Sequence, residues 1–310
     1  MEFFASARPA AGPRGMRLTF GALRLDLVGL DDRRADELLR RYAPYSAEAG
    51  APEPGVLRVA LQLEDRDYFV SPPARPEFNP VFLAAEGERV RYAGYKVAGW
   101  LDTRADQGVL LLARGDYEPD LRSLENYLRV AVAWRAAAAG GALVHAASAV
   151  RDGKAYLFYG ESGAGKSTLA EVTRRATIVS DDLSLVLRGP DGAPQLVGSP
   201  FRGTYEDGPA VQGTFPLAAG FRLVQSESAE VRRVPRMRAL SEVIGNLPFV
   251  AESFAQRPDL FAAIEETFAK VPLAHLHFRK DDSYWDAIDR AALGAPPDDP
   301  ARFDTRKGHS

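Results

Sequence analysis

Cysteine is absent from the sequence, and histidine occurs only four times in 310 residues. The lack of cysteine excludes disulfide bonds, thiolate metal sites and thiol nucleophiles. The histidines are His145, His275, His277 and His309, which are too scattered to predict a zinc site. On a strand, His275 and His277 would share a face and either pair on a metal or be two ordinary polar residues, and the ordinary interpretation is favoured.

A strong charge imbalance and long apolar runs are also missing. The formal net charge is -3, with 46% hydrophobic and 26% charged residues, as in an ordinary globular protein. Because there is no basic excess, neither nucleic acid nor a membrane is expected as a partner. No apolar run approaches the roughly 20 residues that span a bilayer. Glu2 and its neighbours lack the apolar character of a secretory signal, so the expected compartment is the cytoplasm.

The length favours two modest domains or one large one. Residues 1–16 are rich in Ala, Pro, Gly and Arg and are expected to form a disordered extension. Residues 17–118 predict a small α+β domain in which no chemistry is evident. The motifs described below assign 119–294 to an ATP-binding catalytic domain, and the polar residues 295–310 predict a flexible tail.

Hydrophobic periodicity predicts the individual elements. In the first domain, Arg17–Val28 alternates as one strand does, and Arg33–Tyr42 has the spacing of a helix capped by Asp31 or Asp32. In the second, a long helix over Pro119–Ala139 ends at a pair of glycines. Further elements are predicted after it: strands at Ala142–Val150, Ala155–Tyr159, Ile178–Ser180, Leu183–Arg188 and Ala274–Phe278, and helices at Ala239–Asn246 and Asp259–Phe268.

A glycine-rich segment carries the clearest chemistry, and a helix of about ten residues is expected after it. The segment consists of Gly160, Glu161, Ser162, Gly163, Ala164, Gly165, Lys166, Ser167 and Thr168. It fits the pattern of a Gly, four residues and Gly-Lys-Ser/Thr, in which glycines turn backbone N–H groups toward phosphate oxygens. Lys166 is expected to neutralise the β- and γ-phosphates, and the Ser167 hydroxyl to ligate Mg²⁺. The segment therefore predicts a site for ATP with Mg²⁺.

The motifs on either side of this loop resemble a known family. Leu143-Val144-His145-Ala146 precedes it and Val179-Ser180-Asp181-Asp182 follows it, which is similar to the catalytic domain of the HPr kinase/phosphorylase family. The resemblance extends over about 120–290 and implies an α/β (α+β) fold, a P-loop domain like that of phosphoenolpyruvate carboxykinase with a smaller N-terminal α+β domain. Thr168 stands where HPr kinases usually have Glu, so the chain looks closer to HPr-kinase-related proteins of ribosomally made peptide pathways.

The resemblance also implies roles for the residues around the loop. Asp181 is expected to accept the proton of the acceptor hydroxyl, with His145 beside it. Asp182 is expected on the metal or on Lys166, and the order within the aspartate pair stays open. The Mg²⁺ ligands are thus expected to be Ser167 and Asp182.

An arginine is the remaining catalytic candidate. Arg202 lies in the segment Gly198–Gly203, where relatives carry a loop that closes over the phosphates, and it either stabilises transition-state charge or is a solvated turn residue. Arg222, Arg232 and Arg233 are weaker candidates for the same role.

These features together favour an ATP- and Mg²⁺-dependent kinase that transfers the γ-phosphoryl group to a hydroxyl, such as a serine of a protein or of a ribosomally made peptide. Two alternatives stay open, a small-molecule kinase on the same fold and a non-catalytic ATP-binding sensor or scaffold. A homo-oligomer is a further expectation, because the relatives are often hexamers.

Overall fold

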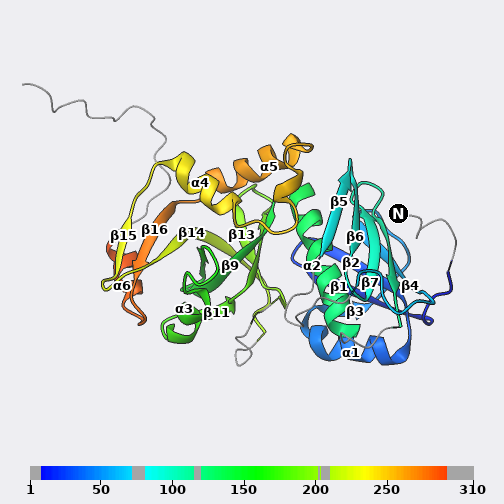
Figure 1. Cartoon of the computed structure of the whole chain (residues 1–310). Coiled ribbons are helices and arrows are strands. Elements are labelled where there is room, and N and C mark those ends of the chain that lie inside the picture. The colour runs from blue at the N-terminus through cyan, green and yellow to red at the C-terminus, as the bar shows by residue number, and fades with distance from the viewer. Residues whose placement is uncertain (1–7, 72–80, 115–119, 202, 204–209, 292–310) are drawn as a thin grey trace, which may run out of the picture.

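The computed structural model describes residues 8–71, 81–114, 120–201, 203 and 210–291. An N-terminal half with strands β1–β8 and a C-terminal half with strands β9–β16 are joined through helix α2 (Figure 1). Three sequence predictions fall outside the described residues, in whole or in part: the first seven residues of the extension 1–16, the role of Arg202, and the tail 295–310.

The N-terminal half is one eight-stranded sheet with the strand order β3-β1-β2-β4-β8-β7-β6-β5. Its elements are β1 (Arg14–Phe20), β2 (Leu23–Leu30), α1 (Asp32–Tyr42), a 3-10 turn (Ala43–Tyr45), β3 (Ser46–Glu48), β4 (Val56–Leu63), β5 (Phe82–Glu86), β6 (Arg89–Ala93), β7 (Val97–Asp102) and β8 (Gln107–Leu112). The prediction of one strand over Arg17–Val28 was wrong, because the chain turns at Gly21, with φ 57°, and β1 pairs antiparallel with β2. The apolar positions shift from Met16, Leu18 and Phe20 before the turn to Leu23, Leu25 and Leu27 after it, so the hairpin appears in the sequence only as a one-residue change of phase.

One face of this sheet is apolar and packs against helices. Leu25 and Leu27 of β2 and Leu57 and Val59 of β4 are all buried there. The helix prediction for α1 was confirmed, and Asp31 is its N-cap, with the Asp31 side chain accepting from the backbone N–H of Arg34. The alternating residues of the same strands point to the opposite face and include Asp26 and Arg58, which form an ion pair at 3.3 Å.

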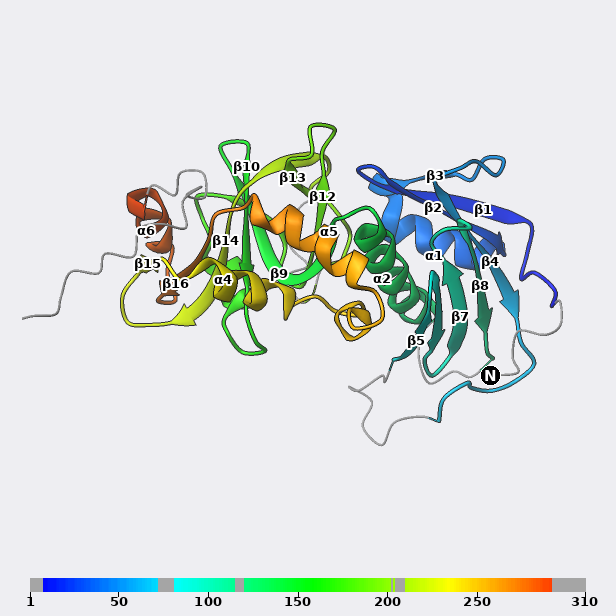
Figure 2. The same ribbon diagram turned by 90° about the horizontal axis from the view of Figure 1, so that it is seen from above.

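Helix α2 (Asp120–Ala138) confirms the predicted long helix and connects the two halves. Nearly all of its apolar residues are buried, and Figure 2 shows it between the N-terminal sheet and α5. Tyr127 donates to the carbonyl oxygen of Trp100 in the N-terminal half at 3.0 Å. Trp134 donates from Nε1 to the carbonyl oxygen of Phe249 in the C-terminal half at 3.1 Å. A single hydrophobic core therefore runs from one half into the other.

The C-terminal half holds the remaining elements. They are β9 (Ala142–Arg151), β10 (Lys154–Tyr159), α3 (Lys166–Val172), β11 (Thr177–Ser180), β12 (Leu183–Arg188), β13 (Pro194–Val197), β14 (Thr214–Gln225), β15 (Glu230–Arg232), α4 (Arg236–Ile244), a 3-10 turn (Ala251–Ser253), α5 (Pro258–Ala269), β16 (Leu273–Phe278) and α6 (Tyr284–Ala291). Strands β9, β10, β11, β12 and β16 and helices α4 and α5 confirm predictions within a few residues at each end. Helix α3 is seven residues long and so shorter than expected.

Five of these strands close into a barrel in the order β10-β9-β12-β13-β14. The closing pair is β10 with β14, which run parallel from Ala155 opposite Leu217 to Tyr159 opposite Arg222. Strand β14 is long enough to pair with β13 at its start and with β10 and β16 further along. Because β10, β14 and β16 are parallel, their carboxyl ends meet at one edge, where the glycine-rich loop begins.

This arrangement overturns the expected fold class, an α/β (α+β) fold like those of HPr kinase and phosphoenolpyruvate carboxykinase. Strands hold 38% of the described residues and helices 27%, and a closed five-stranded barrel is the centre of the C-terminal half. The reason lies in long-range pairing. The sequence pattern located most strands, but the pairing of β10 with β14, about 60 residues further along, depends on tertiary contacts that local periodicity does not encode.

Candidate functional site

The glycine-rich loop joins β10 to α3 and folds around its own lysine. Its backbone has positive φ angles at Gly160, Gly163 and Gly165, of 153°, 80° and 107°. Residues that carry a Cβ rarely adopt such angles. Lys166 is only 8% exposed, and its Nζ donates to the carbonyl oxygens of Gly160 at 2.8 Å and Glu161 at 3.2 Å. The backbone N–H groups in the first turn of α3 have no carbonyl acceptor within that helix. The loop thus presents an ammonium group and backbone donors at one place.

A cavity of about 510 Å³ opens beside this loop. Its walls come from β9, the loop, the turn after β11, Gly203, the end of β14 and the segment that follows β16. The lining consists of His145, Ser162, Gly163, Gly165, Lys166, Ser167, Thr168, Asp181, Asp182, Gly203, Gln225 and Lys280. The structure therefore gathers His145, the loop and both aspartates, which the sequence analysis had singled out, in a single cavity.

The two aspartates sit on a turn between β11 and β12 whose shape is fixed by Ser180. The Ser180 hydroxyl accepts from the backbone N–H of Asp182 at 3.1 Å and donates to the carbonyl oxygen of Phe201 at 2.9 Å. Asp181 is 3% exposed, and its Oδ1 accepts from the backbone N–H of Gly203 at 2.8 Å. The carboxylate of Asp181 is thereby held in one orientation at the cavity wall.

Asp182 lies between two basic side chains. Its Oδ1 is 3.5 Å from Nε2 of His145, and its Oδ2 is 3.5 Å from Nη1 of Arg129 on α2. Arg129 in turn donates from Nη2 to Glu125, one helical turn earlier, at 2.8 Å. The resemblance implied that His145 sits beside Asp181, whereas in the structure the ion-pair partner of His145 is Asp182.

Two of the basic side chains that line the cavity, His145 and Lys166, have lowered pKa values, so their charged forms are disfavoured. Burial lowers the pKa of His145, the nearby Lys166 ammonium lowers it further, and Asp182 acts in the opposite direction. Burial also lowers the pKa of Lys166, and Asp182 again opposes this shift. A negatively charged ligand would favour the protonated form of each group, so the site is electrostatically suited to an anion.

The family of the chain follows from a comparison with family models. Residues 116–293, more than half of the chain, match the family described as SynChlorMet cassette protein ScmC. The chain belongs to the ScmC family. No curated protein matches the chain.

Membership of the ScmC family corrects the resemblance drawn from the sequence. The motifs around His145, Gly160–Thr168 and Asp181-Asp182 suggested HPr kinase/phosphorylase and a P-loop domain of the phosphoenolpyruvate carboxykinase kind. The matching family is a different one, and the strands form a barrel-containing sheet structure. The labels HPr kinase-like, carboxykinase-like and Walker A are therefore wrong for this member of the ScmC family. Short motifs around a glycine-rich loop recur in unrelated settings, so they were too little to fix a family.

Other predicted residues fall at the margin of the cavity or elsewhere. The Glu161 side chain is 88% exposed and lies 3.5 Å from Arg222, whose Nε is 4.0 Å from Glu242. Nε2 of His275 is 2.7 Å from the carboxylate of Glu242, as in an ordinary polar contact.

Among the described residues, no group of three or more His, Asp and Glu side chains is arranged to hold a metal on its own. No helix in the described part of the chain is long and apolar enough to cross a membrane.

Three residues near the cavity were not predicted from the sequence: Arg129, Gln225 and Lys280. Gln225 ends β14 and donates to the carbonyl oxygen of Gly163 at 2.7 Å, and Lys280 follows β16 by two residues. A usable signal existed for these two, because polar residues at the carboxyl ends of parallel strands meet at one edge. Nothing in the local sequence separates Arg129 from the other arginines of α2, because its partner Asp182 is distant in the chain.

Proposed function

We propose that this chain binds ATP with Mg²⁺ in the cavity beside Gly160–Thr168 and transfers the γ-phosphoryl group to a hydroxyl. One observation carries the proposal: a single cavity joins the ammonium of Lys166 and the hydroxyl of Ser167 with the carboxylates of Asp181 and Asp182. Phosphoryl transfer to a hydroxyl needs these parts together, cationic and backbone donors for the phosphates, a metal ligand, and an acceptor for the proton.

The residues that line the cavity fit both the phosphates of ATP and Mg²⁺. Lys166 and the first-turn N–H groups of α3 would hold phosphate oxygens, since burial of the ammonium favours an anionic partner. Ser167 and Asp182 would hold Mg²⁺, which is commonly bound through one or two protein oxygens together with substrate phosphates. Bound Mg²⁺ would neutralise charge on the β- and γ-phosphates. A metal of this kind needs no complete protein cage.

Asp181 is the residue that we assign as proton acceptor. Its Oδ1 is fixed by the N–H of Gly203, and the whole residue is buried at the cavity wall. Asp182 is engaged by Arg129 and His145 on both of its oxygens, which suits it to a positioning and metal-binding role. In this assignment His145 and Arg129 orient Asp182, and Asp181 faces the incoming hydroxyl.

For the acceptor we propose a serine of a protein or peptide, and for the compartment the cytoplasm, where ATP is supplied. Because the family is described as a cassette protein, the products of genes next to this one are the first acceptors to test. A small-molecule acceptor or a nucleotide sensor without transfer would use the same cavity, and the experiment below separates them.

The test uses the full chain with Mg²⁺, γ-labelled ATP and each neighbouring gene product. The expected result is label on a hydroxyl side chain of one product, with Asp181→Asn slower by about 10²- to 10⁴-fold but binding ATP with nearly unchanged affinity. Asp152→Asn, an exposed carboxylate in the β9–β10 turn, is the matched control and should be as active as the wild type. Tight ATP binding with no transfer would contradict the proposal in favour of a sensor, and label only on metabolites in favour of a small-molecule acceptor.

A further inference from the structure

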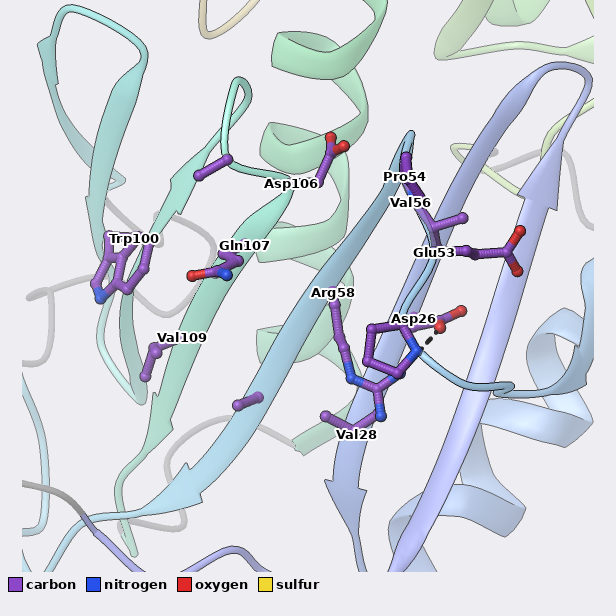
Figure 3. A pocket seen from close by; sticks show the side chains of 14 residues that line it. Asp26, Val28, Glu53, Pro54, Val56, Arg58, Trp100, Asp106, Gln107 and Val109 are labelled. Carbon is purple, nitrogen blue, oxygen red and sulfur yellow. Dashed lines mark hydrogen bonds and ion pairs between the residues drawn. The ribbon is translucent and has the colours of Figure 1, made fainter.

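A second cavity lies on the outer face of the N-terminal sheet. Its volume is about 660 Å³, within the usual range for ligand sites. Four adjacent strands, β2, β4, β8 and β7, form its floor, and the neighbouring turns around Glu53 and Asp106 close it at one end, where the backbone N–H of Gly55 donates to the Asp106 carboxylate at 2.8 Å. In Figure 3, Trp100 lies on one side, Arg58 and Asp26 lie on the other, and Gln107 and Val109 lie between them. The proposed nucleotide site uses none of these residues.

A buried carboxylate anchors the charged side of this cavity. The side chain of Asp26 is 1% exposed, and Arg17 binds both of its oxygens, from Nε at 2.7 Å and from Nη2 at 3.0 Å. Arg58 approaches the same carboxylate at 3.3 Å and also donates to the carbonyl oxygen of Gly50 at 3.1 Å, in both cases from Nη1. The planar end of Arg58, which is 32% exposed, is therefore only partly used by its neighbours.

The charges around Arg58 do not balance. Glu53 accepts from Arg17 and from Arg24, so in this network three guanidinium groups share two carboxylates. The third acidic residue of the cavity lining, Asp106, is already paired with Arg135 of α2. One positive charge is left over, and of the three arginines only Arg58 lines the cavity. A carboxylate brought by a ligand would complete the network with a charge-assisted hydrogen bond.

The opposite side of the cavity is apolar and aromatic. The guanidinium of Arg89 lies over the Trp100 ring, 4.6 Å from its centre, and fixes the indole at the cavity wall. Val28, Ala60 and Val109 lie in one row across β2, β4 and β8, and this row ends at Trp100 on β7. Because β4 and β7 are separated by one strand, the strands that carry Arg58 and Trp100 are roughly 10 Å apart, two strand spacings.

We propose that this cavity binds an extended peptide segment that carries a carboxylate and, about 10 Å along, an aromatic or large aliphatic side chain. The carboxylate pairs with Arg58 and the apolar side chain packs against Trp100. A peptide fits better than a compact molecule because the cavity is a trough across four strands, roughly 14 Å long, and about four extended residues span that length. This proposal concerns peptide binding only and does not depend on whether the chain transfers a phosphoryl group.

The test measures binding to the full chain without nucleotide. The probes are peptides with acetylated and amidated ends that hold one Glu and one Phe separated by one, two or three Ala, and a matched series with Gln in place of Glu. The readout is protection of tryptophan fluorescence from acrylamide. Trp134 and Trp285 are buried, at 1% and 0% exposure, so quenching reports mainly on the partly exposed Trp100. Calorimetry on Trp100→Phe measures binding without the fluorescent group.

The expected result is that a Glu peptide protects Trp100 and binds at least about tenfold more tightly than its Gln counterpart. Arg58→Gln should remove this preference, whereas Arg104→Gln, an exposed arginine in the neighbouring turn, should keep it. If Arg58→Gln does not fold, the affinities of the Glu and Gln peptides for the wild type are measured at several salt concentrations. Added salt should then weaken binding of the Glu peptide more than binding of the Gln peptide, because it screens the ion pair with Arg58. Equal affinity of the two series, an unchanged preference in Arg58→Gln, no binding at all, or binding of benzoate but of no peptide would each overturn the proposal.

Discussion

Replacement of Lys166 by methionine should weaken ATP binding strongly while leaving the chain folded. In the structure the Lys166 ammonium is buried and is held by two carbonyl oxygens of its own loop, Gly160 O at 2.8 Å and Glu161 O at 3.2 Å. These contacts point the ammonium into the centre of the loop, where a phosphate would meet it. Methionine keeps the unbranched apolar part of the side chain and removes the ammonium group with its charge and its hydrogen-bond donors.

The magnitude follows from the contacts that are lost. A hydrogen bond from a charged donor contributes about 1.5–3 kcal/mol, so the affinity for ATP should fall by about 10- to 100-fold. The effect on folding should be smaller. The carbonyl oxygens of Gly160 and Glu161 lose a donor, but burial disfavours the charged ammonium, as its lowered pKa records, so the two effects partly cancel. We expect the free energy of unfolding to change by no more than about 1–2 kcal/mol.

Calorimetric titration with ATP and Mg²⁺ measures the affinity, and urea unfolding measures the stability. Lys154→Met is the matched control, since Lys154 is exposed at the opposite end of β10 and lies outside the cavity. It should bind ATP like the wild type. Equal affinity in Lys166→Met and Lys154→Met would refute the assignment of the loop as the phosphate site.

Three further outcomes are expected from the same site. Gly165→Ala should lower the free energy of unfolding by about 2–4 kcal/mol in urea titrations, because φ is 107° and the new Cβ would come within 2.7 Å of the Phe278 ring. Arg129→Leu should raise the pKa of His145 in an NMR titration, because Asp182 loses its second cation and interacts more strongly with the imidazolium. The pKa of His145 in the folded chain is below its ordinary 6.5, so as the pH falls His145 is protonated in the unfolded chain before it is protonated in the folded chain. The free energy of unfolding should therefore fall as the pH drops from 6.5 toward the folded pKa and then level off. His145→Gln should remove that part of the pH dependence.

Matched variants separate these effects from general damage. Gly163→Ala has the same left-handed strain, with φ 80°, but no atom lies within 4 Å of the new Cβ, so it should cost only about 1–2 kcal/mol. Arg122→Leu, an exposed arginine on α2, should leave the His145 pKa unchanged. Equal losses for the two glycine variants, an unchanged His145 pKa in Arg129→Leu, or the same pH slope in His145→Gln would each contradict the corresponding prediction.

Local sequence sufficed for most helices and strands. The α2 helix has apolar residues at helical spacing and ends at Gly140, with φ 72°, so its length was predictable to within a residue or two. The β9–β10 hairpin likewise turns on Asp152 and Gly153, both with positive φ. In these places the residues that decide the structure are neighbours in the chain.

The fold class and half of the site depended on distant contacts. Strand β14 was not predicted, although it closes the barrel against β10 and delivers Gln225 to the cavity. Arg129 reaches Asp182 only because α2 packs across the outside of β9 and β12. The residue types of the loop, His145 and the aspartate pair were sufficient to locate a candidate site, but they did not fix the family or the sheet around it.

The central claim, that ATP and Mg²⁺ occupy the cavity beside Gly160–Thr168, is tested most directly by a crystal structure with Mg²⁺ and a non-hydrolysable ATP analogue. The account predicts phosphate oxygens within hydrogen-bonding distance of Lys166 Nζ, and Mg²⁺ between the Ser167 hydroxyl and Asp182, with Asp181 facing the γ-phosphate. A triphosphate bound elsewhere on the chain, or an empty cavity at saturating analogue, would contradict it.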